Sequence, residues 1–192
     1  MKFVSLPLRD LLRGGISSQL LQEKLNGFRC ERDTDVARFL QLYAIDNERL
    51  GASRSYLIAD REALDSDGTL RLVAFFTLAI TSTDYSSVSN RAKRRILGDY
   101  PRVSREGHFP GYLLAQLARD DRFTRDDLDC SNLLSFAESI VDAAADAVGG
   151  NLLYLDCKEP LVGYYERFGY TALPHLTHDG FFKMFKSLSG IS

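Results

Sequence analysis

The chain has 192 residues, of which 45% are hydrophobic and 26% are charged. This length and composition predict one globular domain with a sizeable core, and they exclude a disordered or collagen-like chain. The 24 basic and 26 acidic side chains nearly cancel, which excludes a global charge field that would steer the chain to nucleic acid or to an anionic membrane.

Apolar runs in the sequence are shorter than the roughly 20 residues that a membrane span needs. The first residues lack the basic head and long apolar run of a secretory signal. The cysteines, Cys30, Cys130 and Cys157, are odd in number and have no zinc-type spacing, which favours a reducing compartment and no metal site. We therefore expect a cytoplasmic protein without a membrane partner.

The first half of the chain predicts helices and strands in alternation. Residues 5–24 predict one or two short helices, and residues 28–31 predict a first strand. Residues 33–49 show the three-and-four spacing of an amphipathic helix. Residues 55–59 predict a strand, and an acidic turn leads to the apolar run of residues 70–81, which is typical of a central strand.

The second half begins with a polar stretch and then continues the alternation. Strands are predicted at residues 112–118, from 152, near 170 and at 181–185, and helices at 132–148 and from 161. The long helix suits a crossover between two parallel strands. The whole pattern predicts an α/β fold, in which a mixed central sheet carries helices on both faces.

The segment 151–170, NLLYLDCKEPLVGYYERFGY, carries the most specific motif. Pro160 suits the first turn of a helix, and Gly169 suits the left-handed conformation that ends one. The closing residues YYERFGY resemble the signature "(F/Y)YE+xGF" that closes the cofactor site in the GNAT superfamily of N-acetyltransferases. This resemblance implies a GNAT-like domain over residues 1–192, in which 28–186 carry the likeness and 1–27 are an N-terminal helical extension.

A second segment, YLLAQLARD at residues 112–120, looks like the fourth strand of that fold, where the family has "xLxxLAVxP". In the family this strand splays from the fifth, and the pantetheine arm of coenzyme A lies in the gap. The resemblance implies that the main chain of Leu117, Ala118 and Arg119 binds this arm and polarises the thioester carbonyl. Further segments resemble a bacterial and phage subgroup in the same order, namely SRSYL, FFTLA, KRR, GYLLAQLARD and LDCK.

The chain departs from the family at the pyrophosphate loop. The family motif "(Q/R)xxGx(G/A)" is rich in glycine, whereas residues 122–132 read RFTRDDLDCSN and contain three aspartates. The resemblance implies that Arg125 replaces the family's Arg or Gln, and that Ser131 and Asn132 donate to phosphate or cap the following helix. Either the aspartates face solvent and coenzyme A still binds, or they repel the pyrophosphate and binding is weak or lost.

Tyr165 aligns with the tyrosine that protonates, or hydrogen-bonds to, the coenzyme A sulfur in many GNAT members. The alternative is a tyrosine packed between helix and sheet. Tyr164 is expected in the core. Lys158 is expected to contact the cofactor, although many relatives carry an asparagine at that position.

The histidines, Cys157 and the basic stretch give weaker indications of function. The histidines, His108, His175 and His178, are expected in loops as solvated side chains rather than as a general base or metal ligands. Cys157 has no histidine tied to it, so we expect no thiol catalysis. The basic stretch with Arg91, Lys93, Arg94 and Arg95 predicts either a solvated helix face or a surface for RNA phosphates or another acidic partner.

The resemblance implies an acetyltransferase that moves the acetyl group of acetyl-CoA to a primary amine by direct attack, without a metal. The amine acceptor stays unknown. Two alternatives are a non-catalytic GNAT-like binding module with a degenerate cofactor loop, and a toxin that acetylates aminoacyl-tRNA. A homodimer is the usual closed oligomer for a chain of this kind.

Overall fold

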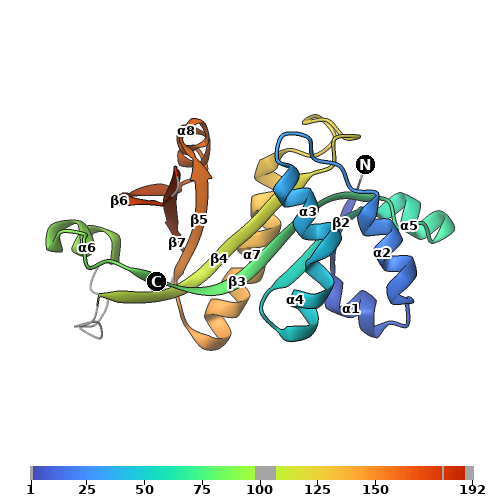
Figure 1. Cartoon of the computed structure of the whole chain (residues 1–192), viewed down its shortest axis with the longest axis horizontal. Helices are drawn as coiled ribbons and strands as arrows, with labels where there is room; N and C mark the ends of the chain where they lie inside the picture. Colours follow the sequence, from blue (N-terminus) through green and yellow to red (C-terminus); the bar gives the residue numbers. More distant parts are fainter. Residues whose placement is uncertain (1, 98–106, 179, 189–192) are drawn as a thin grey trace. The chain divides into compact units, whose positions relative to one another are not determined.

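The computed structural model describes residues 2–97, 107–178 and 180–188, apart from the side chains of Ala92, Arg95, Leu97 and residues 174–178. Its strands form a seven-stranded mixed sheet in the order β1-β2-β3-β4-β5-β7-β6 (Figure 1). The chain divides into two compact units: Met1–Ala79 with Leu114–Ala137 form the first, and Ile80–Leu113 with Glu138–Ser192 form the second.

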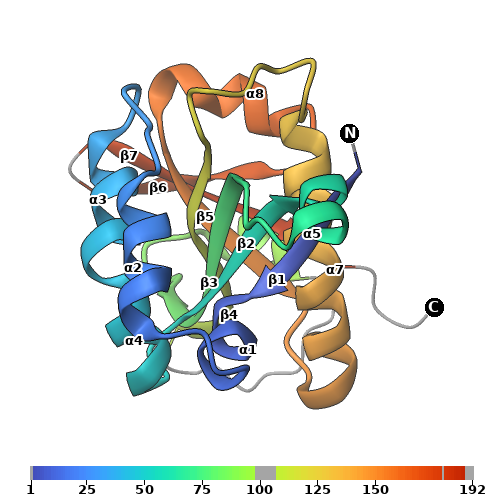
Figure 2. The same ribbon diagram turned by 90° about the vertical axis from the view of Figure 1, so that its right-hand side faces the viewer.

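The first unit is built on an antiparallel part of the sheet. Strand β1 (Phe3–Pro7) pairs with β2 (Arg54–Asp60), and β2 pairs with β3 (Leu72–Asp84). The helices that accompany these strands are α1 (Leu8–Arg13), α2 (Ser18–Asn26), α3 (Thr34–Leu42), α4 (Ala44–Leu50) and α5 (Arg61–Asp67). Figure 2 shows α2, α3 and α4 on one face of these strands and the start of α7 (Cys130–Val148) on the other. The prediction of helices on both faces of a mixed sheet is therefore confirmed.

The core of the first unit explains why its helices form. Leu21 and Leu25 of α2 and Leu40 of α3 are buried in one cluster with Phe75 of β3. The Phe28 ring meets Phe75 edge to face, at 5.1 Å between centroids. Residues three to four apart on a helix share one face, so α2 and α3 each bury an apolar stripe against the strands.

The second unit contains the parallel part of the sheet. Strand β4 (His108–Arg119) pairs in parallel with β5 (Leu152–Lys158), with Tyr112 opposite Leu153 and Leu113 opposite Tyr154. The long helix α7 joins these two strands, as the sequence predicted. Strand β7 (Phe181–Ser187) pairs antiparallel with β5 and with β6 (Thr171–His178). The shorter helical elements are α6 (Asn90–Leu97), the 3₁₀ turn η1 (Glu159–Leu161) and α8 (Val162–Glu166).

Gly111 allows β4 to approach β5 closely. A Cβ atom at this position would lie 2.5 Å from Cε2 of Tyr154 and 2.6 Å from the carbonyl oxygen of Leu152. The hydroxyl of the buried Tyr154 lies 3.1 Å from that of Tyr85, so the two phenols satisfy each other inside the core. Burial raises the pKa of Tyr85 far above its ordinary value.

The predicted strand at 28–31 is wrong, because the first strand is β1. In the first unit the amide of Arg29 donates to Oδ2 of Asp120 at 3.0 Å, and the amide of Glu31 donates to Oδ2 of Asp121 at 2.7 Å. These backbone donors are therefore satisfied by side chains rather than by a neighbouring strand.

Other boundaries also differ from the sequence prediction. The expected helix over 33–49 is two helices, α3 and α4, which meet at Tyr43 (φ −121°, ψ −22°). The acidic turn before Gly68 is helix α5, capped by Asp60, whose carboxylate accepts from the amide of Glu62 at 3.1 Å. That residues 1–192 form one domain stays a prediction. No helix in the described ranges is long and apolar enough to cross a membrane.

Candidate active site

The end of β4 is tied to the loop that follows it by the side chain of Arg119. Its Nε donates to the carbonyl of Phe123 at 3.1 Å, and its Nη1 donates to the carbonyl of Leu128 at 2.7 Å. The residues predicted to contact the cofactor through their main chain, Leu117, Ala118 and Arg119, are the last three of this strand. The sequence assigned only a main-chain role to Arg119, and its loop-closing side chain carries no motif that could have revealed it.

An ion pair between the buried Asp120 and the exposed Arg122 forms the base of the same loop. Asp120 is fully buried, and its two carboxylate oxygens accept from Nε and Nη2 of Arg122 at 2.7 and 2.8 Å. Burial alone raises the pKa of the Asp120 carboxyl, but the hydrogen bonds from Arg122 outweigh burial and hold this pKa below its ordinary value. The loop therefore begins on a fixed, charged anchor.

Two of the three loop aspartates are bound by the loop itself. Oδ2 of Asp127 accepts from both the amide and the hydroxyl of Thr124, at 2.7 and 2.8 Å. Oδ1 of Asp129 accepts from the amide of Ser131 at 2.9 Å, in the first turn of α7. The amides of Thr124 and Ser131, respectively, lower the pKa of Asp127 and of Asp129. Asp126 is exposed.

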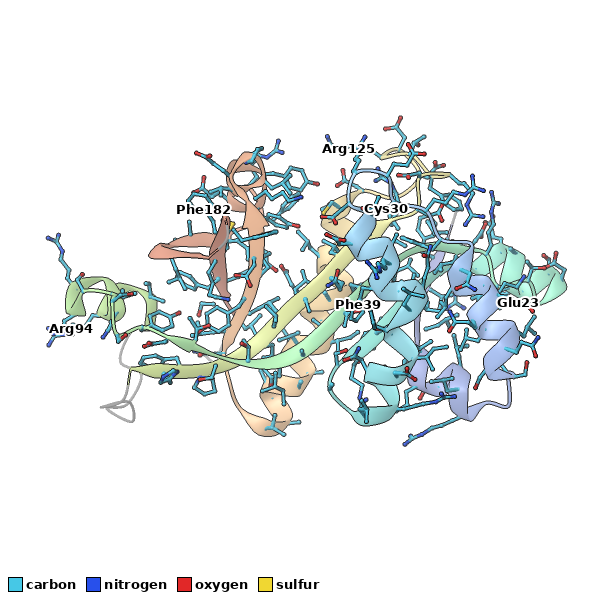
Figure 3. The ribbon with its side chains drawn as sticks, viewed as in Figure 1. Glu23, Cys30, Phe39, Arg94, Arg125 and Phe182 are labelled. Atoms are coloured by element: carbon cyan, nitrogen blue, oxygen red, sulfur yellow. The ribbon has the colours of Figure 1, made fainter. Side chains whose placement is uncertain are left out.

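The loop offers donors for a pyrophosphate together with one competitor. The amides of Arg125, Asp126 and Asp127 donate to no acceptor in the part of the chain that the structure describes. The Arg125 side chain (Figure 3) is 69% exposed. Its Nε lies 3.2 Å from Oδ2 of Asp129. Three successive amides beside a guanidinium fit an anionic group. The Asp129 carboxylate competes for the same place, because it already holds the amide of Ser131 and pairs with Arg125.

Asn132, which was also predicted to contact the cofactor, lies beside a cavity of the first unit. The cavity has a volume of ≈ 360 Å³ and is lined by Phe3, Leu128, Asn132, Ser135 and Phe136. The backbone amide of Asn132 donates to the carbonyl of Asp129 at 3.1 Å at the start of helix α7. Its side chain is exposed.

Tyr165 lies in α8 of the second unit and is partly exposed. Its ring meets the rings of Tyr164 and Tyr170 edge to face, with centroids at 5.7 and 5.9 Å. Its carbonyl accepts from the amides of Phe168 at 2.9 Å and Tyr170 at 3.3 Å. The tyrosine that the resemblance marks is thus fixed in backbone and ring, with part of its surface open to solvent.

Of two other predicted residues in the second unit, Tyr164 differs from its prediction and Lys158 stays untested. Tyr164, expected in the core, is partly exposed, with the guanidinium of Arg167 4.9 Å from its ring centroid. Lys158 ends β5 as an exposed side chain, and its Nζ lies 6.0 Å from the ring centroid of Phe181. Its predicted contact with the cofactor stays a prediction.

The other candidate groups add no chemistry to these sites. The expectation that the histidines lie in loops is wrong, because His108 begins β4 and His175 and His178 lie in β6. His108 is exposed, and the side chains of His175 and His178 lie outside the described residues. Burial raises the pKa of Cys157, whose Sγ lies 3.4 Å from Sδ of Met184. Within the described residues no group of three His, Cys, Asp or Glu side chains could hold a metal ion.

The basic stretch forms helix α6. Arg91 and Arg94 are exposed, and Figure 3 shows Arg94 extending away from the helix. The side chain of Arg95 lies outside the described residues. Exposed arginines are common to both alternatives that the sequence left open, a solvated helix face and a surface for an acidic partner.

No family model matches this chain. Several solved structures share its fold. AtaT complexed with acetyl-methionyl-tRNAfMet matches with a TM-score of 0.67 and 18% identity over 97% of this chain and 95% of AtaT. A tyrosine-to-phenylalanine variant of KacT matches with a TM-score of 0.68 and 16% identity over 97% of this chain and 95% of KacT. AtaTR bound with acetyl-CoA matches with a TM-score of 0.67 and 17% identity over 96% of this chain and 93% of that chain.

At these identities the likeness establishes the fold. The chain has the mixed α/β fold of the AtaT and KacT structures, and the GNAT-like fold predicted from the sequence is confirmed.

Proposed function

We propose that this chain is an acetyltransferase that moves the acetyl group of acetyl-CoA to a primary amine. The observation that carries the proposal is the loop between β4 and α7, where the amides of Arg125, Asp126 and Asp127 have no acceptor in the described chain and the Arg125 guanidinium is exposed. Backbone donors in such a row, in the loop that leads into the 19-residue helix α7, suit a pyrophosphate without requiring the backbone freedom of glycine.

The reaction that we propose needs few protein groups. The amine nitrogen attacks the thioester carbonyl, a C–N bond forms, the C–S bond breaks, and the nitrogen releases one proton to solvent. Main-chain donors at Leu117, Ala118 and Arg119 stabilise the developing oxyanion. Tyr165 donates its phenolic proton to the departing sulfur and recovers it from solvent. Ser131, Asn132 and Lys158 are proposed as further contacts of coenzyme A.

We further propose that the amine belongs to an aminoacyl-tRNA. Two observations favour this acceptor over an unspecified amine: the fold is that of AtaT complexed with acetyl-methionyl-tRNAfMet, and α6 presents Arg91 and Arg94 to solvent. Exposed arginines suit the phosphate backbone of RNA. A homodimer in a cytoplasmic setting stays part of the proposal.

The test is transfer of radiolabelled acetyl from acetyl-CoA to a panel of acceptors, namely aminoacyl-tRNA, a lysine-containing peptide and a small primary amine. We expect label in the tRNA fraction, and a large loss of it in the Tyr165→Phe variant. Label on the peptide or the small amine alone would keep the transferase and remove the tRNA. If acetyl-CoA does not bind to this chain, a non-catalytic binding module replaces both the acetyltransferase and the aminoacyl-tRNA proposal.

A further inference from the structure

We propose that Tyr170, Glu138 and Lys186 form a positioning set that fixes the ring of Tyr165. The inference rests on the proposed function, in which the Tyr165 phenol donates a proton to the coenzyme A sulfur. All four side chains belong to the second unit, and they come from α7, α8, β7 and the turn before β6.

The turn after α8 couples Tyr165 to Tyr170. The amide of Tyr170 donates to the carbonyl of Tyr165 at 3.3 Å, and the amide of Gly169 donates to the carbonyl of Glu166 at 3.0 Å. Gly169 has φ 86°. This is the Schellman pattern, in which a left-handed glycine ends the helix and an apolar contact spans the turn. Here that contact is the edge-to-face pair of the two tyrosine rings, 5.9 Å apart.

Tyr170 is in turn held at its hydroxyl and at its ring face. The residue is buried, and its hydroxyl donates to Oε1 of Glu138 at 3.2 Å. Nζ of Lys186 donates to Oε2 of the same carboxylate at 2.8 Å and lies 5.6 Å from the Tyr170 ring centroid. The Glu138 and Lys186 side chains are 20% and 27% exposed, so this pair is better shielded from water than an ordinary surface ion pair.

The set gives Tyr165 a rigid support. Glu138 lies in the long helix α7 and Lys186 in β7, which is paired along its length with β5. A catalytic group must be placed to within a fraction of an ångström, and a displacement of about 1 Å can cost a hundredfold in rate. We therefore expect loss of the Tyr170 hydroxyl or of the Glu138 charge to lower kcat about tenfold. KM for acetyl-CoA should stay unchanged, because neither group is proposed to contact the cofactor.

A spectroscopic test does not depend on activity. 3-Fluorotyrosine placed at position 165 of the full chain should give one narrow ¹⁹F resonance. Tyr170→Phe and Glu138→Gln should shift or broaden it. Two matched controls should leave it in place. Tyr112→Phe removes a hydroxyl that donates to the carbonyl of Gly149 at 2.8 Å, and Lys183→Gln on β7 removes an ion pair with Asp156 of β5. An unchanged resonance in both test variants would overturn the positioning set.

Kinetics of the same variants separate this inference from the proposed function. If the natural chain transfers acetyl and Tyr165→Phe is impaired, an unchanged kcat in Tyr170→Phe and Glu138→Gln overturns the inference alone. If the natural chain transfers acetyl to no acceptor while the ¹⁹F resonance responds as expected, the transferase fails and the support of Tyr165 stands as a structural device.

Discussion

The carboxylate of Asp129 accepts a hydrogen bond from the amide of Ser131 at 2.9 Å, and so occupies a donor in the first turn of α7. Its other oxygen lies 3.2 Å from Nε of Arg125. A negative side chain at a helix start stabilises the helix. It also holds two donors that an anionic ligand could use, so we expect this pair of residues to affect cofactor affinity in the proposed site.

Asp129→Asn should tighten the binding of acetyl-CoA. Asparagine keeps the helix cap but removes the charge and releases Arg125. One unit charge at about 4 Å in water is worth about 1 kcal/mol, so we expect affinity to rise about fivefold. Calorimetric titration of both proteins measures this difference. Equal or weaker binding would show that the Asp129 carboxylate does not face the ligand.

Arg125→Glu should weaken binding of acetyl-CoA by roughly 1–3 kcal/mol, because a charge-assisted hydrogen bond to phosphate is lost. The matched control is Arg61→Glu, which reverses another exposed arginine of the first unit at the start of α5. Only the Arg125 variant should lose affinity in the same titration. Unchanged affinity would remove Arg125 from the site.

Asp120 should make the stability of the chain sensitive to acid. The pKa of Asp120 is held below its ordinary value in the folded chain. The stabilisation is therefore fully present above the pKa that Asp120 has in the unfolded chain. It is lost as pH falls through the lower pKa that Asp120 has in the folded chain, which places the loss below about pH 4. Asp120→Asn should cost about 2 kcal/mol at pH 7, because hydrogen bonds to a charged group are lost.

Denaturant unfolding at pH 7 and at pH 3 checks this prediction. The difference in unfolding free energy between the natural chain and Asp120→Asn should shrink at the lower pH. A difference that is the same at both values would mean that the Asp120 charge contributes nothing to folding.

Gly111→Ala should destabilise the chain by about 1–3 kcal/mol, the usual cost of overpacking a core. The added Cβ would meet Cε2 of Tyr154 at 2.5 Å and the carbonyl oxygen of Leu152 at 2.6 Å. The control is Gly163→Ala in α8, where the added Cβ would meet nothing within 4 Å. This variant should stabilise the chain by about 0.5–1 kcal/mol. Thermal unfolding of the two variants should move in opposite directions.

The sequence predicted the elements whose signal is local and long. The apolar run that forms β3 and the periodic stripe that forms α7 each specify their own structure over many residues. Strand β1 was missed because it has five residues and ends in Pro7, and its identity depends on pairing with β2 far along the chain. The segment after Phe28 was misread because its amides are bound by Asp120 and Asp121, which no local pattern reveals.

The candidate site was predictable to a similar degree. The motif at the end of α8 marked Tyr165 as a candidate because the aromatic residues and Gly169 have a fixed spacing. The fate of the loop aspartates was left open, since a string of residues does not show whether a carboxylate faces solvent or its own backbone. The support of Tyr165 by Glu138 and Lys186 was not predictable, because these residues lie 27 and 21 positions from it in sequence and meet only through Tyr170.

Expression of an enzyme that acetylates aminoacyl-tRNA should stop protein synthesis. We expect growth arrest when the natural chain is induced in a bacterial host, and relief of the arrest by Tyr165→Phe at equal protein level. Labelled amino-acid incorporation measures the block. Arrest that persists with Tyr165→Phe would point to a cause other than acetyl transfer.

Calorimetric titration of the full chain with acetyl-CoA, supported by thermal shift, decides whether the loop between β4 and α7 still binds the cofactor. We expect micromolar affinity for acetyl-CoA and a rise in Tm with ligand concentration. No heat of binding and no shift at millimolar acetyl-CoA would contradict the proposed transferase and leave a GNAT-like binding module.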